Sequence, residues 1–435
     1  MRELDDIAQW LASREAAHPF AASTSLPSPS FMRGGREYVS FSTNNYLALA
    51  TDPLIVQAAK DGLDRYGMGN CESRLLGGDI ELYREVEARL AALTGKDEAV
   101  LFGAGYLANL GALGTLVRGS QLARLYGYKP TRSYRYTYFS DELNHVSINE
   151  GIRLSGADKV TYRHGDLEQL EDRLQAATDR EKIIVTDGVF SQDGDIAPLP
   201  QLLQLAERHD ATVYVDDAHG FGVLGTQGAG VAEHFGLRSD RLIYMATLSK
   251  AIGVNGGFVA TDAATAQVLR LGSPAYGFTG SILPDQAAAV TAALGVLASQ
   301  PERRRHLWDN QRYFVEKVRA LGYRLVSDET PVVPLLVGDE ARGDAMAAAL
   351  LAAGIYVDAV KFPAVALHQC RLRFIMNARH TRAQIDRVLD VLATLAPSYV
   401  DPGPVRRTGS AKPAASLEKI AVSGMWIVPL STAAM

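Results

Sequence analysis

The sequence has few cysteines and no long apolar segment. Its two cysteines, Cys71 and Cys370, lie far apart and lack metal-ligand spacing, so we expect no disulfide framework and no bound metal. No segment approaches the roughly 20 apolar residues that span a bilayer. Residues 1–6 lack the basic start and apolar core of a signal peptide. These absences favour a cytoplasmic protein without a membrane span.

The composition is that of an ordinary globular protein. Of 435 residues, 47% are hydrophobic and 21% are charged, and the net charge of −5 gives no reason to expect nucleic acid as a partner. A chain of this length can form one large domain and a smaller one.

Strand-like and helix-like segments alternate from about residue 98 to residue 260. We expect strands at 98–102, 182–187 and 213–215, and helices at 107–117 and 199–208. This alternation predicts an α/β fold with a mainly parallel sheet covered by helices. Its ligands should lie at the carboxyl ends of the strands.

Two of these strand ends carry residues suited to imine chemistry. Lys250 follows a short apolar run, where partial desolvation lowers the pKa of an amine. Upstream, residues 213–216 form an apolar run that ends in Asp216, with His219 three residues later. A buried acid needs a cationic partner, and a protonated pyridine ring is one. The alternative is a surface lysine, an Asp216 that caps a helix and a His219 that is a satisfied polar group.

Several other residues have both a structural and a functional interpretation. Residues 103–105 are small and precede a helix, which suits either a plain turn or an anion held on helix amides. His145 fits either a structural role or stacking on a planar cofactor. Asn44 fits a turn. Arg373 is either an exposed charged residue on an edge strand or an arginine whose planar guanidinium group binds a carboxylate.

The stretch 119–138 is basic and aromatic and contains no acidic residue. One interpretation is a loop or hairpin that packs on a second subunit. The other is an arm that contacts an anionic phosphopantetheine carrier, because arginine and tyrosine suit phosphate and interface contacts.

We expect four regions along the chain. They are an N-terminal helix and arm (1–44), a large domain with the inserted arm (45–285), a small C-terminal α+β domain (286–397) and a flexible tail (398–435).

Taken together, the motifs resemble those of the α-oxoamine synthases, which are pyridoxal-phosphate (PLP) enzymes of the aspartate-aminotransferase fold. The resemblance covers about residues 35–397. It rests on the order and spacing of six segments: 43–47, 141–147, 188–194, 216–220, 247–250 and 371–373. It implies fold type I, with a seven-stranded, mainly parallel sheet in the large domain. It also implies a homodimer.

The resemblance implies a role for each matching residue. Lys250 is similar to the lysine that binds PLP covalently and then acts as base, and Asp216 to the acid on the pyridine nitrogen. His219 matches the partner of the ring hydroxyl, and His145 the imidazole stacked on the ring. Further cofactor contacts are implied for Ala104, Gly105, Tyr106, Ser191, Thr247 and Ser281.

The implied reaction joins an α-amino acid to an acyl thioester, carried by CoA or by an acyl carrier protein. Asn44 and Arg373 match the groups that bind the amino-acid carboxylate. The products are an α-amino ketone, CO₂ and a free thiol. The sequence departs from residues common in this family at Tyr83, at 70–72 and at Gly280. We therefore expect a role in secondary or lipid metabolism. The alternatives are an aminotransferase or retro-aldol activity, or a non-catalytic partner subunit.

Overall fold

The structure is a computed structural model that describes residues 2–13, 22–26, 29–125 and 127–399. The chain divides into two compact units. The described residues of unit 1 fall within Met1–Thr43, Gln192–Gly194 and Leu307–Met435, and unit 2 comprises Asn44–Ser191 and Asp195–His306. The expected tail lies outside the described residues from residue 400 onward. Within the described ranges, no helix combines the length and apolarity needed to cross a membrane.

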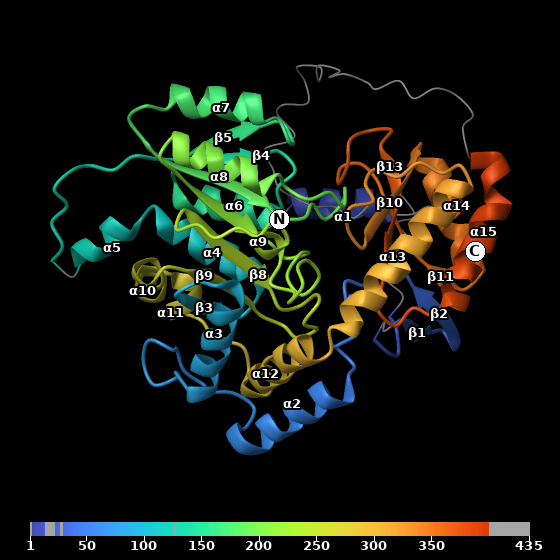
Figure 1. The fold of residues 1–435 in the computed structure, drawn as a ribbon, viewed down its shortest axis with the longest axis horizontal. Coiled ribbons are helices and arrows are strands. Elements are labelled where there is room, and N and C mark those ends of the chain that lie inside the picture. The colour runs from blue at the N-terminus through green and yellow to red at the C-terminus, as the bar shows by residue number, and fades with distance from the viewer. Residues whose placement is uncertain (1, 14–21, 27–28, 126, 400–435) are drawn as a thin grey trace. The chain divides into compact units, whose positions relative to one another are not determined.

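A seven-stranded sheet with the order β3-β9-β8-β7-β6-β4-β5 forms the centre of unit 2 (Figure 1). The neighbours from β8 to β5 are parallel, and β9 is antiparallel to both β3 and β8. This confirms the predicted mainly parallel sheet. The strands are β3 (Glu98–Phe102), β4 (Tyr136–Asp141), β5 (Asp158–Tyr162), β6 (Glu181–Asp187), β7 (Ala211–Asp216), β8 (Leu242–Thr247) and β9 (Gly257–Thr261).

Helices connect these strands because parallel strands need long crossovers. The helices of unit 2 are α2 (Pro53–Tyr66), α3 (Glu81–Thr94), α4 (Gly105–Leu116), α5 (Gly119–Leu125), α6 (Val146–Ser155), α7 (Leu167–Ala176), α8 (Leu199–Arg208), α9 (Val231–His234), α10 (Ala263–Gly272), α11 (Pro274–Gly277) and α12 (Pro284–Ser299).

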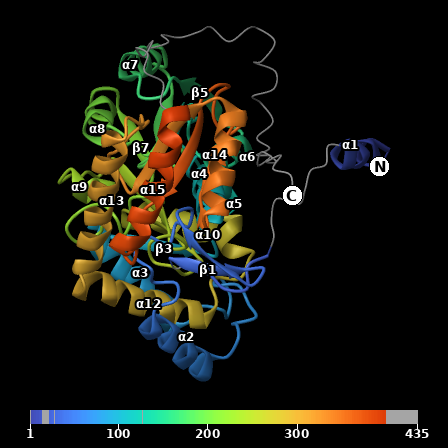
Figure 2. The same cartoon turned by 90° about the vertical axis from the view of Figure 1, so that its right-hand side faces the viewer.

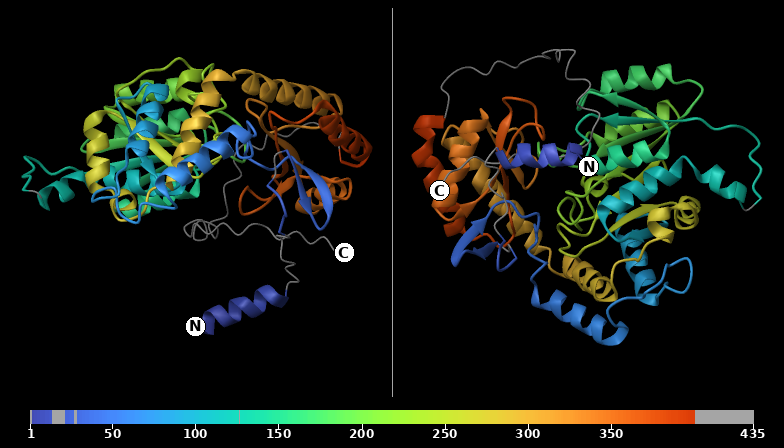
Figure 3. Two further views of the ribbon diagram at one scale, coloured as in Figure 1. Left: turned by 90° about the horizontal axis from the view of Figure 1, so that it is seen from below. Right: turned by 180° about the vertical axis from the view of Figure 1, so that it is seen from behind.

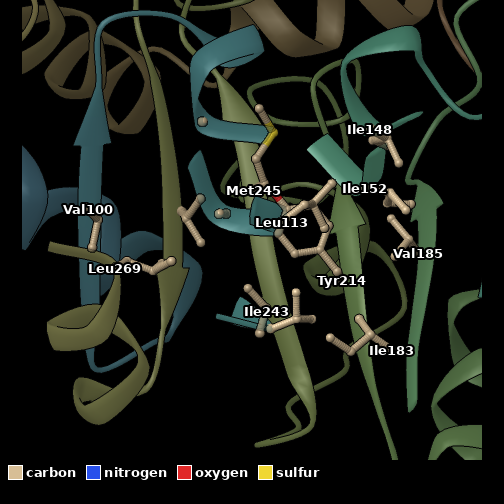
Figure 4. Close-up of a cluster of buried hydrophobic side chains, with 14 of the residues drawn as sticks. Val100, Leu113, Ile148, Ile152, Ile183, Val185, Tyr214, Ile243, Met245 and Leu269 are labelled. Atoms are coloured by element: carbon tan, nitrogen blue, oxygen red, sulfur yellow. The ribbon is translucent and has the colours of Figure 1, made fainter. Parts of the chain in front are cut away.

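A buried hydrophobic cluster joins the sheet to α4 and α6 (Figure 4). Val185, Tyr214 and Met245 come from three neighbouring strands, and Leu113 and Ile148 come from the two helices. All five are buried. This packing fixes α4 and α6 against the strands whose ends carry the predicted site.

The helices α2 and α12 run side by side (Figure 3). Gly62 of α2 permits this approach, because a Cβ atom there would lie 2.7 Å from the Cβ atom of Ala288. A larger residue at either position would force the two helices apart.

Unit 1 combines both ends of the described chain. Its strand β2 pairs in parallel with β11, so N-terminal residues share a sheet with C-terminal ones. A second sheet has the order β10-β13-β12, and α14 lies beside α15 (Figure 2). The elements are α1 (Arg2–Ser13), β1 (Ser30–Arg33), β2 (Arg36–Ser40), α13 (Glu302–Ala320, which begins in unit 2), β10 (Val332–Gly338), α14 (Glu340–Ala352), β11 (Ile355–Tyr356), β12 (Asp358–Val360), β13 (Cys370–Ile375) and α15 (Arg382–Tyr399).

The basic, aromatic stretch 119–138 falls into three parts. It begins with the short helix α5, has no regular structure over residues 127–135 and ends in β4 (Figure 1). Tyr138 is buried in β4, and its hydroxyl group donates a hydrogen bond of 2.5 Å to the Leu113 carbonyl. The last three residues therefore belong to the sheet, and the exposed charges come from the part before Tyr136.

Candidate active site

Polar residues end four neighbouring parallel strands of unit 2. They are Asp141 on β4, Asp187 on β6, Asp216 on β7 and Thr247 on β8. In the register of the sheet, Asp187 lies directly beside Asp216. All four are buried, at the edge where parallel sheets bind ligands. Burial next to Asp216 raises the pKa of Asp187 well above its ordinary value.

Asp216 is held by two donors. The Asn109 Nδ2 atom of α4 lies 2.6 Å from its Oδ2 atom, and the backbone N–H of Ala218 donates to Oδ1 over 3.1 Å. Its exposed fraction is only 5%. A buried carboxylate is stable in its charged form when a cation faces it.

His145 caps the start of α6. Its Nδ1 atom lies 2.7 Å from the Ser147 hydroxyl oxygen and accepts the Ser147 backbone N–H over 3.3 Å. Burial by the surrounding protein lowers the pKa of the imidazole, although the residue as a whole remains exposed. Asp216 raises this pKa and Lys250 lowers it further, so the charges of both residues act on His145. The structure therefore brings these three predicted residues together.

His219 follows the strand that ends in Asp216. It is buried, and its Nδ1 atom lies 2.6 Å from the hydroxyl group of Tyr46. Behind it, Asp217 is completely buried and accepts hydrogen bonds of 2.7 Å from the Tyr244 hydroxyl and the Val231 amide. Burial raises the pKa of Asp217 to about 7. Asp217 supports the turn that presents His219.

The N-terminus of α4 meets the ends of β8 and β9. A Cβ atom on Gly105 would lie 2.8 Å from the Thr247 Cβ and Oγ1 atoms, and one on Gly257 would lie 2.5 Å from the Gly105 Cα atom. Ala104 occupies the N-cap position, and no side chain caps the helix there. Gly105 and Tyr106 form its first turn. The amides of this turn suit an anion.

Lys250 follows β8 and is half-buried. The hydroxyl group of Thr247 fixes the turn before it, because it donates to the Gly256 carbonyl over 3.0 Å and lies 2.9 Å from the Ser249 hydroxyl. The lysine and the α4 N-terminus therefore share one end of the sheet.

The remaining predicted residues lie in three places. Asn44 and Ser191 are half-buried in unit 2, and the Asn44 carbonyl accepts the Tyr46 amide over 2.8 Å. Ser281 is also in unit 2, and its Oγ atom is buried without a hydrogen-bond partner among the described residues. Arg373 belongs to unit 1, where it is buried on β13 and pairs in register with Pro334 and Asp358.

Sequence reasoning missed Asn109. It is 1% exposed, lies in the largely apolar helix α4 and contacts both Asp216 and Ser147. A polar side chain on the buried face of an apolar helix was the available signal, because such a group needs a buried partner.

A family model described as aminotransferase class I and II matches residues 36–392. The chain belongs to this family. The 8-amino-7-oxononanoate synthase 1 of Bacillus velezensis is 39% identical over 369 residues, which are 85% of this chain and 90% of that protein. The 8-amino-7-oxononanoate synthase of Anaeromyxobacter dehalogenans is 40% identical over 376 residues, which are 86% of this chain and 90% of that protein.

Solved structures agree with these relatives. A serine palmitoyltransferase solved with PLP has a TM-score of 0.82 and 31% identity, and covers 91% of this chain and 97% of its own. The Sphingomonas wittichii serine palmitoyltransferase has a TM-score of 0.82 and 30% identity, with coverage of 92% and 97%. An 8-amino-7-oxononanoate synthase from Francisella tularensis has a TM-score of 0.69 and 28% identity, with coverage of 83% and 98%. The predicted α-oxoamine synthase membership, fold type I and PLP dependence are confirmed.

The residues present fit PLP. Asp216 offers a buried acid, as a protonated pyridine nitrogen requires, and the uncapped first turn of α4 lies beside Thr247, as a phosphate requires. Lys250 lies at the same end of the sheet. The unsatisfied hydroxyl group of Ser281 is one more polar atom in unit 2 that a ligand could satisfy.

Proposed function

We propose that this chain joins an α-amino acid to an acyl thioester with loss of the amino-acid carboxylate as CO₂. The new bond forms between the amino-acid Cα atom and the acyl carbon, and the thiol leaves. The observation that carries the proposal is the placement of Asp216, Lys250 and His145 at or just after the carboxyl ends of parallel strands of one sheet, in a PLP-dependent family.

Asp216 and His219 would orient the cofactor ring. The Asp216 carboxylate would hold a proton on the pyridine nitrogen, because a buried ion pair strongly favours the charged forms. His219, fixed by Tyr46, would contact the ring hydroxyl group. When bound, PLP supplies the electron-accepting ring that makes a negative charge at Cα accessible.

Lys250 would bind the cofactor covalently before substrate arrives. With the amino acid bound, the free Lys250 amine would remove the proton from Cα. His145 would cover one face of the ring and exclude water from it.

The first turn of α4 would hold the phosphate group. Its contacts would come from the amides near Ala104, Gly105 and Tyr106 and from the Thr247 hydroxyl group. The close approach of Gly105 to Thr247 supports this assignment, because it leaves no room for a side chain between them. Ser191 and Ser281 would complete the cofactor contacts.

Asn44 and Arg373 would bind the substrate carboxylate, as the family motifs imply. Arginine suits this task because its planar fork matches a carboxylate. We expect Arg373→Lys to raise the KM for the amino acid by about tenfold or more, because a bidentate pair is lost. The amino acid, the acyl chain and a place in secondary or lipid metabolism stay predictions, as does the cytoplasmic location.

Substitutions in the exposed part of the arm (residues 119–138) can test whether the acyl donor is carried by a carrier protein. Arg124 and Lys129 are exposed and form no ion pair with any described residue, whereas Arg132 and Arg135 pair with Glu181 and Asp179. If the arm binds an acidic carrier protein, the variant Arg124→Glu/Lys129→Glu should raise the KM for the carrier-bound donor only. Equal effects on the acyl-CoA and the carrier-bound donor would contradict this role.

We also infer a homodimer. Met68, Leu76 and Phe278, here called the Phe278 patch, have exposed fractions of 72%, 74% and 87%. Their segments adjoin, because the Ser73 hydroxyl group donates to the Gly277 carbonyl over 2.6 Å. Large apolar side chains gathered in this way favour burial against another protein surface. Ser281, three residues from Phe278, has a buried hydroxyl group without a described partner, which supports a ligand next to this surface.

The proposal is tested by product analysis with purified protein, PLP, one amino acid and one acyl thioester. Glycine, L-alanine and L-serine are tried separately, with acyl-CoA and carrier-bound donors. An α-amino ketone together with equimolar CO₂ and free thiol is the expected result. A keto acid without CO₂ would instead indicate transamination. The absence of any product from every pair, despite bound PLP, would favour a non-catalytic subunit.

A further inference from the structure

A chain of buried hydrogen bonds runs through unit 2 from Tyr214 to His145, with Asn109 in the middle. The Tyr214 hydroxyl lies 2.9 Å from Asn109 Oδ1. Asn109 Nδ2 lies 2.6 Å from Asp216 Oδ2 and 2.8 Å from Ser147 Oγ. Ser147 Oγ then lies 2.7 Å from His145 Nδ1. The chain of hydrogen bonds therefore connects two residues that would both contact the cofactor ring, Asp216 at its nitrogen and His145 on its face.

The chemistry of the partners fixes the orientation of the Asn109 amide. An ionised carboxylate can only accept hydrogen bonds, so the NH₂ group must face Asp216. The Oδ1 atom is then left for Tyr214, whose hydroxyl group donates to it. The two hydrogens of Nδ2 are shared between Asp216 and Ser147, so each polar atom of the amide has a partner.

The same reasoning fixes the tautomer of His145. The Ser147 backbone N–H can only donate, and it points at Nδ1 over 3.3 Å. Nδ1 must therefore be the unprotonated ring nitrogen. The Ser147 hydroxyl group accepts from Asn109, so its own proton is directed to Nδ1 as well. The proton of the neutral imidazole is left on Nε2.

We propose that Asn109 is a positioning residue that orients Asp216 directly and His145 through Ser147, and that it holds His145 as the neutral Nε2–H tautomer. The relevance to catalysis rests on the proposed function, in which both side chains contact PLP. The arrangement is complete in the protein itself, so both groups are oriented before the cofactor binds. Such preorganisation lowers the cost of binding and of reaction.

The tautomer is measured by the ¹⁵N chemical shifts of the imidazole nitrogens in the full-length protein, with and without PLP. Nine histidines are present, and the His145 signals are assigned by their loss in His145→Gln. We expect an unprotonated Nδ1 and a protonated Nε2 in the wild type. Ser147→Ala should produce a mixture of tautomers, and Ser147→Thr, which keeps the hydroxyl group, should restore the wild-type pattern.

Asn109→Ala should disturb both ends of the chain. We expect the His145 shifts to change and the affinity for PLP to fall by about tenfold or more, since a hydrogen bond to a charged group is lost. Tyr214→Phe removes only the hydroxyl group that orients the amide and should change the His145 shifts in the same direction. Tyr138→Phe is the matched control, because Tyr138 is equally buried on β4 of the same sheet and donates to Leu113 instead. It should change neither readout.

A protonated Nδ1 in wild-type His145 would overturn the proposal. Unchanged His145 shifts in Asn109→Ala would do the same. If Asn109→Ala does not fold, Ser147→Ala and Tyr214→Phe decide the question, and wild-type shifts in both would contradict it. The shifts without PLP do not depend on the proposed function. If the wild type binds no PLP, the proposed function fails while the tautomer assignment is still tested.

Discussion

Arg74 holds the glycine-rich loop at residues 66–78 of unit 2 through a buried ion pair. It lies 2.7 Å from Glu87, and both residues are at most 5% exposed. Its guanidinium group also lies 5.2 and 5.1 Å from the ring centres of Tyr83 and Tyr276. Removing one partner of such a pair leaves a buried charge without compensation.

We therefore expect Arg74→Ala to lower the free energy of unfolding of the protein by about 3–5 kcal/mol. Arg270, at 3.5 Å from Glu87, would offset part of this loss. Arg89→Ala is the control, because it breaks an exposed pair with Glu85 and should cost about 0.5 kcal/mol or less. Urea unfolding of both variants gives the comparison, and equal midpoints would contradict the role assigned to Arg74.

His164 gives the molecule a pH-dependent contact. Its ring nitrogens lie 3.2 Å from Asp141 Oδ1 and 3.0 Å from Asp195 Oδ2. Burial lowers the pKa of the imidazole, but the hydrogen bonds and charges of the two carboxylates outweigh it and raise the pKa to about 10. Because this lies above the unfolded value of about 6.5, the stabilisation is complete below that pH. It disappears as the pH rises through about 10.

His164→Gln should accordingly cost about 2–4 kcal/mol of unfolding free energy near pH 6 and progressively less towards alkaline pH. Unfolding experiments over this range test the trend. His306→Gln, at an exposed position of α13, should leave the profile as in the wild type. A deficit for His164→Gln that stays constant with pH would argue that the ring is neutral.

Single residues were predictable where a motif marked them. Asp216, His145 and Lys250 stand at strand ends, and the structure places them together. Asn109 had no such mark, because its partners Ser147 and Asp216 are 38 and 107 residues away in sequence. The contact between His164 and the two carboxylates was missed for the same reason. Local patterns do not reveal hydrogen bonds between distant segments.

Helix α4 offers a test of the phosphate assignment. At Gly105 an added Cβ would collide with Thr247, whereas at Gly114 of the same helix it would meet nothing within 4 Å. Gly105→Ala should move the first turn of the helix and lower the affinity for PLP by about tenfold or more, a loss typical of displaced ligand contacts.

Gly114→Ala, by contrast, should keep the PLP affinity and stabilise the protein by about 0.5–1 kcal/mol, because alanine is the better helix former. Titration of both variants with PLP provides the measurement. Wild-type affinity in Gly105→Ala would show that the first turn of α4 does not hold the phosphate.

Elements with clear periodicity were predicted well. The strand at 98–102 and the helix at 199–208 were predicted with the bounds that the structure has. Tyr136–Tyr138 were placed in the arm because tyrosines and basic residues continue up to them, yet Tyr136 already begins β4. Composition alone does not separate an exposed tyrosine from a buried one, since burial depends on the neighbouring strands β5 and β6.

At the scale of the whole molecule, the inferred homodimer can be tested by a substitution in the Phe278 patch. We expect the wild type to sediment as a dimer and Phe278→Asp to weaken association by at least about tenfold, because a charge in an apolar contact stays unpaired. Leu154→Asp on α6, where the exposed fraction is 46%, is the control and should remain dimeric. A wild type that sediments as a monomer would contradict the inference.

The pairing of β2 with β11 shows what sequence order could not predict at this scale. The alternating pattern of residues 37–42 predicts a strand, but nothing in that stretch identifies its partner strand more than 300 positions later. Strand partners depend on tertiary packing. The sequence alone therefore could not show that unit 1 contains both N-terminal and C-terminal segments.

The most direct test of the account is the attachment site of PLP. Borohydride reduction of the PLP-loaded protein, followed by digestion and mass spectrometry, locates the covalently bound cofactor. We expect the PLP mass on the peptide that contains Lys250, and no modified peptide from Lys250→Ala. PLP attached specifically to another lysine, or none on Lys250 in the wild type, would contradict the assignment on which the proposed reaction rests.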